Sequence, residues 1–266
     1  MRVFDCFTFF NELDMLELRL REMDPVIDIF VLAEADHTHT NNPKEFLFEK
    51  NKERFSQWLH KIRHIKVTDM PISSDAWDNE NFQRNAVSRG LTDIEPDDLI
   101  LVSDVDEIFR TESIEYCKAV PNEKYCFRMA LYQYRLNYQR TNSGAFTEWG
   151  MAMLGSQLKN TTPQQLRNER HFPLPVNCKI IDHGGWHFSW QGDSEFLKNK
   201  CKNMAHQEYN NSYNIEEFNQ FEKFFETNSG GNIYAGHTFE IVKIDEYFPK
   251  VLQNSPGFLS HLILPS

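Results

Sequence analysis

The chain has 266 residues, 14% of them aromatic, and a formal net charge of −11. This length supports one large α/β domain or two small ones, and the aromatic content favours a well-packed core. The negative charge argues against nucleic acid or an anionic membrane surface as the main partner. Nucleotides remain possible ligands, because a bound metal ion can reverse the local sign of a site.

The amino-terminal segment lacks the features of a targeting sequence. Asp5, Glu12 and Asp14 interrupt any apolar region. No run approaches the roughly 18 uncharged apolar residues of a membrane-spanning helix. The five cysteines are scattered without the close pairs of a structural zinc site, so we expect reduced thiols. The sequence therefore predicts a cytoplasmic protein with no signal peptide and no membrane span.

The first 120 residues alternate short apolar runs with segments of helical periodicity. The expected strands are residues 3–10, 26–33, 62–67 and 99–102. The expected helices are residues 13–23, with Asn11 as the cap, and residues 51–60, 79–90 and 111–119. This alternation indicates βαβ units, a mostly parallel sheet and an α/β fold.

The apolar run 99–102 leads into three carboxylates, Asp104, Asp106 and Glu107. Such a run predicts a strand buried on both faces. Carboxylates at its end would repel one another, and they lie where open α/β sheets bind ligands. A divalent cation such as Mg²⁺ or Mn²⁺ would compensate, especially with substrate phosphates in its shell. The alternative is an acidic turn that caps a helix starting at Thr111.

Beyond residue 120 the pattern changes. Aromatic alternation over residues 125–138 predicts one long strand, with Tyr132, Tyr134 and Tyr138 on one side. The other expected elements are strands at 146–150 and 178–181, a polar loop at 158–177, and helices at 192–204, 215–225 and 244–252. No Gly-rich dinucleotide loop or Walker motif follows any expected strand. The acidic strand end must therefore carry any phosphate chemistry.

Five short blocks occur in a fixed order: residues 7–14, 30–34, 83–85, 103–108 and 185–189. Together they resemble glycosyltransferase family 17, which includes β-1,4-mannosyl-glycoprotein β-1,4-N-acetylglucosaminyltransferases. The resemblance begins at residue 4 and covers most of the chain. It implies a GT-A-type fold, a nucleotide-sugar donor, a divalent metal (Mn²⁺ or Mg²⁺) and an inverting transfer.

We therefore expect a single GT-A-like domain over residues 1–266, with a Rossmann-like, mostly parallel sheet flanked by helices and a mixed carboxyl-terminal part. Residues 1–120 are the expected nucleotide-sugar-binding half, and residues 121–266 complete the acceptor and metal sites. The expected activity is that of a hexosyltransferase that moves GlcNAc from UDP-GlcNAc onto a hydroxyl of a glycan or glycoconjugate acceptor.

The expected metal ligands are Asp104, Asp106 and His187. Asp106 is the leading direct ligand, whereas Asp104 contacts either the metal or the ribose or sugar of the donor. Neutral imidazole is a good Mn²⁺ ligand, and the resemblance implies a late histidine on the metal. The alternative for His187 is a core histidine. Three other histidines compete for the role: His183, His206 and His237.

The expected donor-binding residues are Glu34, Arg84, Asn85, Asp104 and Gly185. Arg84 and Asn85 resemble the donor-contacting pair of related transferases, although an i,i+4 ion pair with an acidic neighbour also explains Arg84. Glu34 could read the base or ribose. Gly185 would let the backbone approach the sugar or diphosphate, and a tight turn is the alternative.

An inverting transfer also needs a base that deprotonates the acceptor hydroxyl. The expected candidates are Asp182, Asp193, Glu195 and Glu148. The resemblance favours Asp193 and Glu195, which follow the Asp-x-Asp motif at a distance similar to that in other inverting GT-A enzymes. Both are also ordinary residues for the start of a helix.

Two other functions compete with sugar transfer. A domain of this kind could bind nucleotide sugars or glycans without catalysis, because fold does not guarantee activity. A haloacid dehalogenase-type phosphatase also places Asp-x-Asp after an apolar strand. That motif continues with Thr or Val where this chain has Ile108, and no convincing downstream lysine and acidic pair follow.

Overall fold

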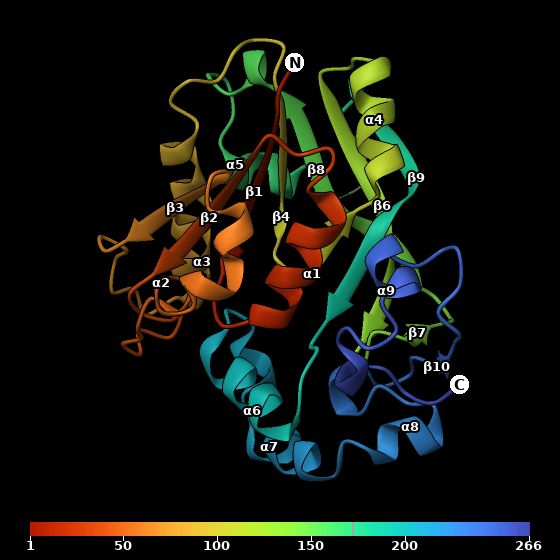
Figure 1. Ribbon diagram of the computed structural model, residues 1–266. Coiled ribbons are helices and arrows are strands. Elements are labelled where there is room, and N and C mark those ends of the chain that lie inside the picture. The colour runs from red at the N-terminus through yellow and green to blue at the C-terminus, as the bar shows by residue number, and fades with distance from the viewer. Residues whose placement is uncertain (172) are drawn as a thin grey trace.

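A mixed sheet forms the centre of the molecule (Figure 1). The computed structural model describes all 266 residues except Phe172 and the side chain of Glu148. The strands of the described chain are β1 (Val3–Phe9), β2 (Ile29–Ala35), β3 (Ile62–Val67), β4 (Leu99–Asp104), β5 (Glu107–Phe109), β6 (Lys124–Gln133), β7 (Tyr138–Arg140), β8 (Phe146–Leu154), β9 (Cys178–Ser189) and β10 (Phe239–Ile241).

The strand order is β10-β7-β6-β8-β4-β1-β2-β3, and β9 pairs with β5 and β6. The strands β3, β2, β1 and β4 run parallel to one another. From β8 onward the pairing is mixed, because β8 joins β4 and β6 antiparallel while β9 joins β6 parallel. The expected α/β fold, with a parallel amino-terminal sheet and a mixed carboxyl-terminal part, is confirmed.

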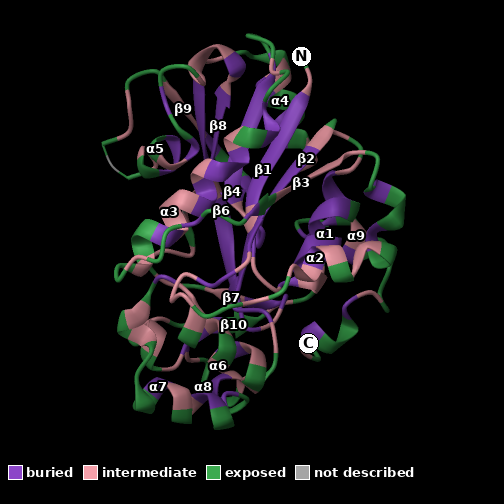
Figure 2. Cartoon of the chain, turned by 90° about the vertical axis from the view of Figure 1, so that its left-hand side faces the viewer, coloured by how far each residue is buried: buried purple, intermediate pink, exposed green. Residues whose placement is uncertain are grey.

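Helices cover both faces of this sheet (Figure 2). They are α1 (Leu13–Met23), α2 (Leu47–Lys50), α3 (Ala76–Ala86), α4 (Thr111–Ala119), α5 (Pro163–Asn168), α6 (Ser194–Asn203), α7 (Ser212–Glu217), α8 (Lys223–Thr227) and α9 (Lys250–Asn254). In Figure 2, α3 and α5 lie on one side of the strands, and α1, α2 and α9 lie on the other. No helix of the described chain is long and apolar enough to cross a membrane.

The alternation of side chains along β1 explains the two faces. Phe7 and Phe9 belong to a core that includes α1, whereas Phe4 and Cys6 pack with residues of α3. Successive side chains of a strand point to opposite faces, and both faces of β1 are buried, including the charged Asp5 that pairs with Arg19 of α1. This burial fixes β1 at the centre of the sheet.

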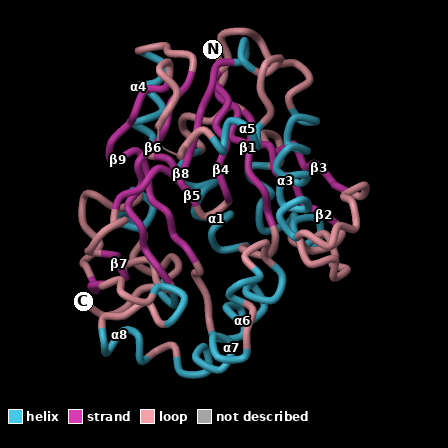
Figure 3. Tube along the Cα trace, turned by 180° about the vertical axis from the view of Figure 1, so that it is seen from behind, coloured by secondary structure: helices cyan, strands magenta, loops and turns pink. Residues whose placement is uncertain are grey.

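A third core lies beyond the carboxyl edge of the parallel strands. The helices α6, α7 and α8 gather there (Figure 1, Figure 3). Apolar side chains of these helices and of the turn between α7 and α8, including Leu197, Phe224 and Phe218, pack around Tyr134 and Tyr138. This third core brings the carboxyl-terminal part of the chain against the edge where β1, β2 and β4 end.

The structure corrects three local expectations. The strand predicted over 125–138 stops at Gln133, because Tyr134 takes a left-handed conformation with φ of 63°. The predicted loop 158–177 contains α5, which begins with a capping box formed by Thr162 and Gln165 and has Pro163 at its first position. Asn11 does not cap α1: Glu12 holds the cap position, without a side-chain capping bond.

Two expected helices are divided. The segment predicted as residues 51–60 forms a 3₁₀ helix, Lys52–Trp58, which follows the short helix α2 and is interrupted by a non-helical conformation at Phe55. The segment predicted as residues 215–225 is split between α7 and α8 by the 3₁₀ turn Phe218–Gln220. In both cases apolar periodicity located the buried face but not the local break.

Candidate active site

Three carboxylates cluster at the carboxyl edge of the parallel strands. Asp104 ends β4, Glu107 begins β5, and Asp106 lies in the turn between them. The register pairs Thr8 of β1 with Asp104, so the ends of β1 and β4 meet at this point. Open α/β sheets bind ligands at such an edge.

Arg19 of α1 fixes the backbone of this turn. Its guanidinium is fully buried and forms an ion pair with the equally buried Asp5 of β1. It also donates hydrogen bonds to the carbonyl oxygens of Asp104 at 2.9 Å and Glu107 at 2.7 Å. Charge-assisted hydrogen bonds are stronger than neutral ones, so the shape of the turn is set within the protein itself.

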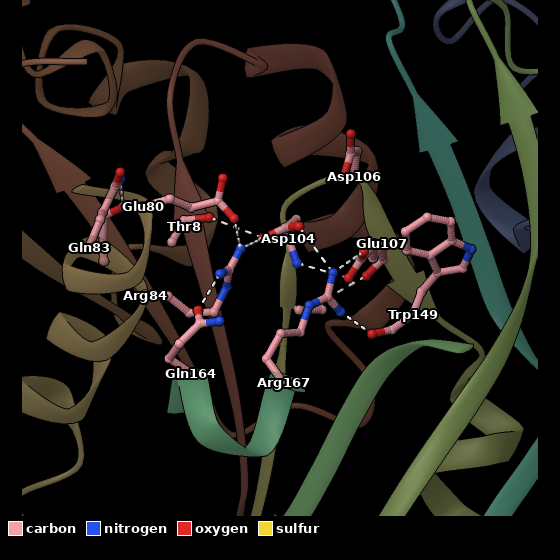
Figure 4. Close-up of polar contacts among 12 residues, drawn as sticks. Thr8, Glu80, Gln83, Arg84, Asp104, Asp106, Glu107, Trp149, Gln164 and Arg167 are labelled. Carbon is pink, nitrogen blue, oxygen red and sulfur yellow. Dashed lines mark hydrogen bonds and ion pairs between the residues drawn. The ribbon is translucent and has the colours of Figure 1, made fainter. Parts of the chain in front are cut away.

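Two arginines from different helices converge on Asp104 (Figure 4). Arg84 of α3 lies 2.9 Å from its Oδ1, and Arg167 of α5 lies 3.1 Å from its Oδ2. Burial acts to raise the pKa of Asp104, but the two guanidiniums outweigh burial and hold that pKa well below its usual range. Asp104 is therefore ionised at neutral pH and has two fixed cationic partners.

Glu107 supports the same cluster from within the fold. Its side chain is fully buried, and one carboxylate oxygen pairs with Arg167. The other oxygen accepts a hydrogen bond from the backbone N–H of Asp104 at 3.0 Å. Arg167 also donates to the carbonyl of Trp149. Glu107 thus holds both Arg167 and the end of β4 in place.

Asp106 has quite different surroundings and lies apart from the arginines in Figure 4. Its Oδ1 is 3.6 Å from Nε2 of His187, and its Oδ2 is 3.3 Å from Nζ of Lys200. Burial raises the pKa of Asp106, and Lys200 and His187 offset only part of that rise. The carboxylate is therefore less well compensated than that of Asp104.

Lys200 of α6 bridges two acids. Its Nζ lies 3.3 Å from Oε1 of Glu12 and 3.3 Å from Oδ2 of Asp106. Burial opposes the charge, but the two carboxylates outweigh burial and raise the pKa of Lys200. The same helix meets the loop after β2, where the hydroxyl of Thr40 donates to the carbonyl of Lys202 at 3.1 Å. These contacts fasten α6 across the edge of the sheet.

Asp106 and His187 are the pair whose chemistry fits a divalent cation. Antiparallel pairing of β5 with β9 places His187 opposite Glu107. Burial lowers the pKa of His187, so the ring is neutral at pH 7 and keeps a lone pair. Its Nδ1 is buried without a hydrogen-bond partner in the described chain. A carboxylate oxygen and an imidazole nitrogen together suit Mn²⁺.

The protein alone does not form a complete metal cage at this point. Among the described residues, no group of three His, Cys, Asp or Glu side chains could hold one ion. Asp104, the third ligand expected from the sequence, is bound by arginines instead. Any cation on Asp106 and His187 would therefore need further oxygen ligands from substrate or water, as Mg²⁺ and Mn²⁺ commonly take.

The three competing histidines lie against other partners: His183 on Phe146, His206 on Trp77 and His237 on Arg140.

Arg170, two residues beyond α5, adds a third guanidinium to this region. Its carbon Cζ lies 5.4 Å from the centre of the Trp149 ring. Its Nη1 is buried and has no hydrogen-bond partner among the residues that the structure describes. Burial and the neighbouring Arg167 lower the pKa of Arg170 to about 10, so it stays charged at neutral pH. Such a group can donate hydrogen bonds to an anionic oxygen.

Arg84 and Asn85, expected as a donor-contacting pair, lie where α3 meets α5. Arg84 forms the i,i+4 ion pair with Glu80 at 2.8 Å and a second ion pair with Asp104 at 2.9 Å, and its contact with the donor stays a prediction. Oδ1 of Asn85 accepts a hydrogen bond from the backbone N–H of Gln164 at 3.0 Å. Asn85 therefore ties the two helices together, and Arg84 reaches the carboxylates.

Two other expected donor contacts have structural roles. Glu34 is fully buried, and its carboxylate binds Lys44 at 3.1 Å and His64 at 3.0 Å. These partners hold it inside the fold and away from a ribose. Gly185 lies against β5, where a Cβ atom would come within 2.3 Å of the carbonyl oxygen of Ile108. Glycine at this position permits close approach of two strands rather than of a sugar.

The expected bases have partners of their own. Oδ1 of Asp193 caps α6 by accepting a backbone hydrogen bond at 2.9 Å. Glu195 is 83% exposed and pairs with Lys198. Asp182 pairs with Arg128 at 3.0 Å. These contacts explain the three residues as surface and capping groups, and their role as base stays a prediction.

The sequence singled out Arg84 but did not point to the other cations that surround the acids. Arg167 and Arg170 lie in a segment predicted to be a loop, and Lys200 lies on a correctly predicted helix without any distinguishing pattern. The capping box at Thr162 is the local signal for α5. The fourth candidate base, Glu148, has a side chain outside the described part of the structure.

The family model "Glycosyltransferase family 17" matches residues 1–223. This span contains the β4 carboxylates, Arg167, His187 and Lys200. The class of protein is therefore a glycosyltransferase. Because the match covers most of the chain, the protein belongs to glycosyltransferase family 17.

Individual relatives are distant. The chain is 23% identical over 216 residues to the human β-1,4-mannosyl-glycoprotein 4-beta-N-acetylglucosaminyltransferase, and the mouse enzyme gives the same value. These alignments cover 71% of this chain and 40% of each relative, so the chain spans less than half the length of the relatives it matches.

Similar solved structures include two nucleotidyltransferases. The 4-diphosphocytidyl-2C-methyl-D-erythritol synthase aligns with a TM-score of 0.37 and 12% identity, over 74% of this chain and 91% of that one. The inositol-1-phosphate CTP transferase from T. maritima aligns with a TM-score of 0.39 and 10% identity, over 84% and 96%. Scores this low support no conclusion about function.

Proposed function

We propose that this protein is a metal-dependent, inverting glycosyltransferase that moves GlcNAc from UDP-GlcNAc onto a hydroxyl of a glycan or glycoconjugate acceptor. The observation that carries the proposal is the pairing of Asp106 with His187 beside the arginine-bound Asp104, at the ligand-binding edge of the sheet. Membership of the family supports sugar transfer, and the name of the human relative supports GlcNAc as the sugar.

The difficult event in such a reaction is departure of the nucleoside diphosphate, on which negative charge develops. In this proposal Asp106 and His187 hold Mn²⁺ or Mg²⁺, and the bound ion supplies positive charge to the diphosphate. Arg170 supplies a second positive charge, through the buried N–H that lacks a partner in the described chain. Burial strengthens both interactions, because the effective dielectric constant is lower than in water.

Asp104 has the role of positioning the donor. Its side chain is 35% exposed, so part of it remains accessible after Arg84 and Arg167 have bound. Those arginines keep the carboxylate ionised and fixed in direction. A fixed acceptor can take hydrogen bonds from ribose or sugar hydroxyls without losing further side-chain freedom.

The base for the acceptor hydroxyl remains open among Asp182, Asp193 and Glu195. Two of these residues begin α6, the helix that places Lys200 on Asp106. A rise of about 1.5 Å per residue separates Asp193 from Lys200 by about 10 Å along the helix axis. Small rotations of α6 would therefore move the start of the helix relative to the acidic cluster.

The proposal is tested by incubating the protein with UDP-GlcNAc, Mn²⁺ and a panel of glycan acceptors, with detection of UDP and of the mass of the product. We expect UDP release and an acceptor heavier by one GlcNAc, with no product from the Asp106→Asn variant. Transfer of a different sugar in a donor screen would correct the donor alone. Hydrolysis of simple phosphate esters without sugar transfer would indicate a phosphatase. Binding of Mn²⁺ and UDP-GlcNAc without turnover would indicate a non-catalytic module.

A further inference from the structure

A cavity of about 360 Å³ lies beside the acidic cluster and has no role in the donor chemistry described above. Three segments line it: residues 39–41 after β2, residues 73–77 leading into α3, and residues 205–208 after α6. Its volume falls at the lower end of the range for small-ligand sites. Two of the helices next to these segments, α3 and α6, lie one above the other in Figure 1 and Figure 3.

One wall of the cavity is aromatic. Trp77 is 39% exposed, an unusual state for so large an apolar side chain. His206 meets its ring edge-on with 4.5 Å between ring centres, and Tyr209 stacks on His206 at 5.4 Å. These contacts hold the indole in one orientation. An exposed and immobilised indole offers a flat apolar surface to a ligand.

Apart from Ala76 and Ala205, the remaining lining is polar and includes the imidazole of His39. Hydroxyl and amide groups come from Thr40, Asn41, Ser73, Ser74 and Gln207, and carboxylates come from Asp75 and Glu208. Neither Lys nor Arg is among the lining residues. The carboxylates of Asp75 and Glu208 would repel a phosphate or another anion here. A neutral, hydroxyl-rich ligand would find many hydrogen-bond partners.

The loop that forms one side of the cavity is prearranged. Nδ2 of Asn79, which is fully buried, donates to the carbonyl of His39 at 2.8 Å and to Oδ1 of Asn41 at 3.0 Å. Nδ2 of Asn41 in turn donates to the carbonyl of Ser73 at 2.7 Å. Asn41 has a φ of 65°, a left-handed conformation that Asn tolerates better than most residues. A loop ordered in this way loses little entropy when a ligand binds.

A short chain of contacts joins the cavity to Asp104. Nδ1 of His39 lies 3.8 Å from Oε2 of Glu80 and has no hydrogen-bond partner in the described chain. Glu80 binds Arg84 at 2.8 Å, and Arg84 binds Asp104 at 2.9 Å. The cavity is therefore separated from the acidic cluster by three side chains.

From these features we propose that the cavity binds a neutral sugar unit of the acceptor glycan. The less polar C–H face of a pyranose ring would lie on Trp77, and its hydroxyls would meet the polar wall. This inference rests on the proposed transferase function. It commits to the acceptor rather than the nucleotide, because the carboxylates of Asp75 and Glu208 disfavour phosphate.

The test compares three variants: Trp77→Ala, Trp77→Phe, and Tyr213→Ala as a matched control. Tyr213 is 63% exposed on α7 and does not line the cavity. The wild-type protein is first screened on an array of neutral oligosaccharides, and the glycan that binds best is used for calorimetric titration. We expect Trp77→Ala to weaken glycan binding about tenfold or more, Trp77→Phe to restore most of it, and Tyr213→Ala to leave it unchanged.

Binding of UDP with Mn²⁺ is measured in the same variants, and we expect it to be unchanged in all three. The proposal is overturned if no neutral glycan binds, or if Trp77→Ala binds the glycan as tightly as wild type. It is also overturned if Trp77→Ala weakens UDP binding instead, because the indole would then serve the nucleobase. If the wild-type protein does not bind UDP, the proposed function is contradicted. The glycan titrations test the cavity independently of that result.

Discussion

The two aspartates of the β4 turn stand two residues apart and have opposite surroundings. Asp104 is bound by Arg84 and Arg167, which hold its pKa well below the usual range. Asp106 faces His187 and Lys200, and burial raises its pKa. One short motif thus combines a carboxylate held between two arginines with one that faces a histidine and a lysine, and we propose the second as the metal ligand. The difference comes from distant segments, since α3 and α5 serve the first and α6 and β9 serve the second.

The largest expected effect is on catalysis at Asp106. Replacing Asp106 by Asn keeps the shape of the side chain but removes the charge that would hold a metal. We expect transfer to fall by about 10³-fold or more, because metal and electrostatic stabilisation of a leaving group is worth several kcal/mol. UDP release measures the activity, and thermal unfolding checks that the variant is folded. Activity within tenfold of wild type would remove Asp106 from the site.

Removing an acidic partner from the arginine cluster should lower the free energy of unfolding. Glu107→Gln leaves the buried Arg167 without its closest counter-charge, and the two side chains are only 1% and 3% exposed. Breaking such a pair costs about 3–5 kcal/mol of unfolding free energy. Urea denaturation measures the change. Glu195→Gln is the matched control, because that exposed ion pair should contribute within about 0.5 kcal/mol. A loss below about 1 kcal/mol in Glu107→Gln would contradict the role given to this residue.

Replacing Arg170 should weaken donor binding without lowering the stability of the fold. Arg170→Met removes a guanidinium that has no ion-pair partner among the described residues, so we expect the melting temperature to stay constant or rise. The KM for the donor should rise about tenfold, equivalent to about 1.4 kcal/mol. Arg89→Met serves as control, because Arg89 is exposed and pairs with Asp69. An unchanged KM for the donor would show that Arg170 does not contact the diphosphate.

A smaller effect is expected at the opposite end of β4, where Asp98 binds Arg2 at 2.7 Å. Burial acts to raise the pKa of Asp98, but Arg2 and backbone N–H groups outweigh it, so the net shift is downward. A carboxyl whose pKa is lower in the folded state than in the unfolded state stabilises the fold. This contribution is complete when the pH is above the unfolded pKa of about 3.9, and it is lost as the pH falls through the folded pKa.

The unfolding free energy should therefore decrease between about pH 5 and pH 3, and less steeply in Asp98→Asn than in wild type. Denaturant titrations at several pH values measure the slope. Identical slopes in the two proteins would mean that Asp98 does not contribute to the acid sensitivity. For both proteins, the unfolding free energy of wild type at neutral pH is the reference value.

The parallel half of the fold could be predicted from sequence because its patterns are local. Ile62–Val67 is a strand within the predicted bounds, and Thr111–Ala119 is a helix as expected. The apolar run before Asp104 correctly located the acidic strand end. The mixed half was harder, since Tyr134 interrupts an aromatic alternation by adopting a left-handed conformation that alternation does not encode.

The candidate site could be predicted in its acidic part, and the resemblance to the family also singled out His187 and Arg84, which the structure places beside Asp106 and Asp104. Only one residue separates Asp104 from Asp106 in the chain, so a motif identifies them together. Arg167, His187 and Lys200 come from three separate elements, and only tertiary packing brings them to the acids. Glu34 illustrates the opposite error. The position of Glu34 at the end of a strand predicted a contact with a ligand. In the structure its carboxylate binds Lys44 and His64 inside the fold.

The most direct test of the account is calorimetric titration of UDP in the presence of Mn²⁺ or of a chelator. We expect wild-type protein to bind UDP at least about tenfold more tightly with Mn²⁺, a difference of about 1.4 kcal/mol. Asp106→Asn and His187→Ala should lose this enhancement while remaining folded. UDP binding that is equally tight in the presence of the chelator would contradict the assignment of Asp106 and His187 as the metal pair.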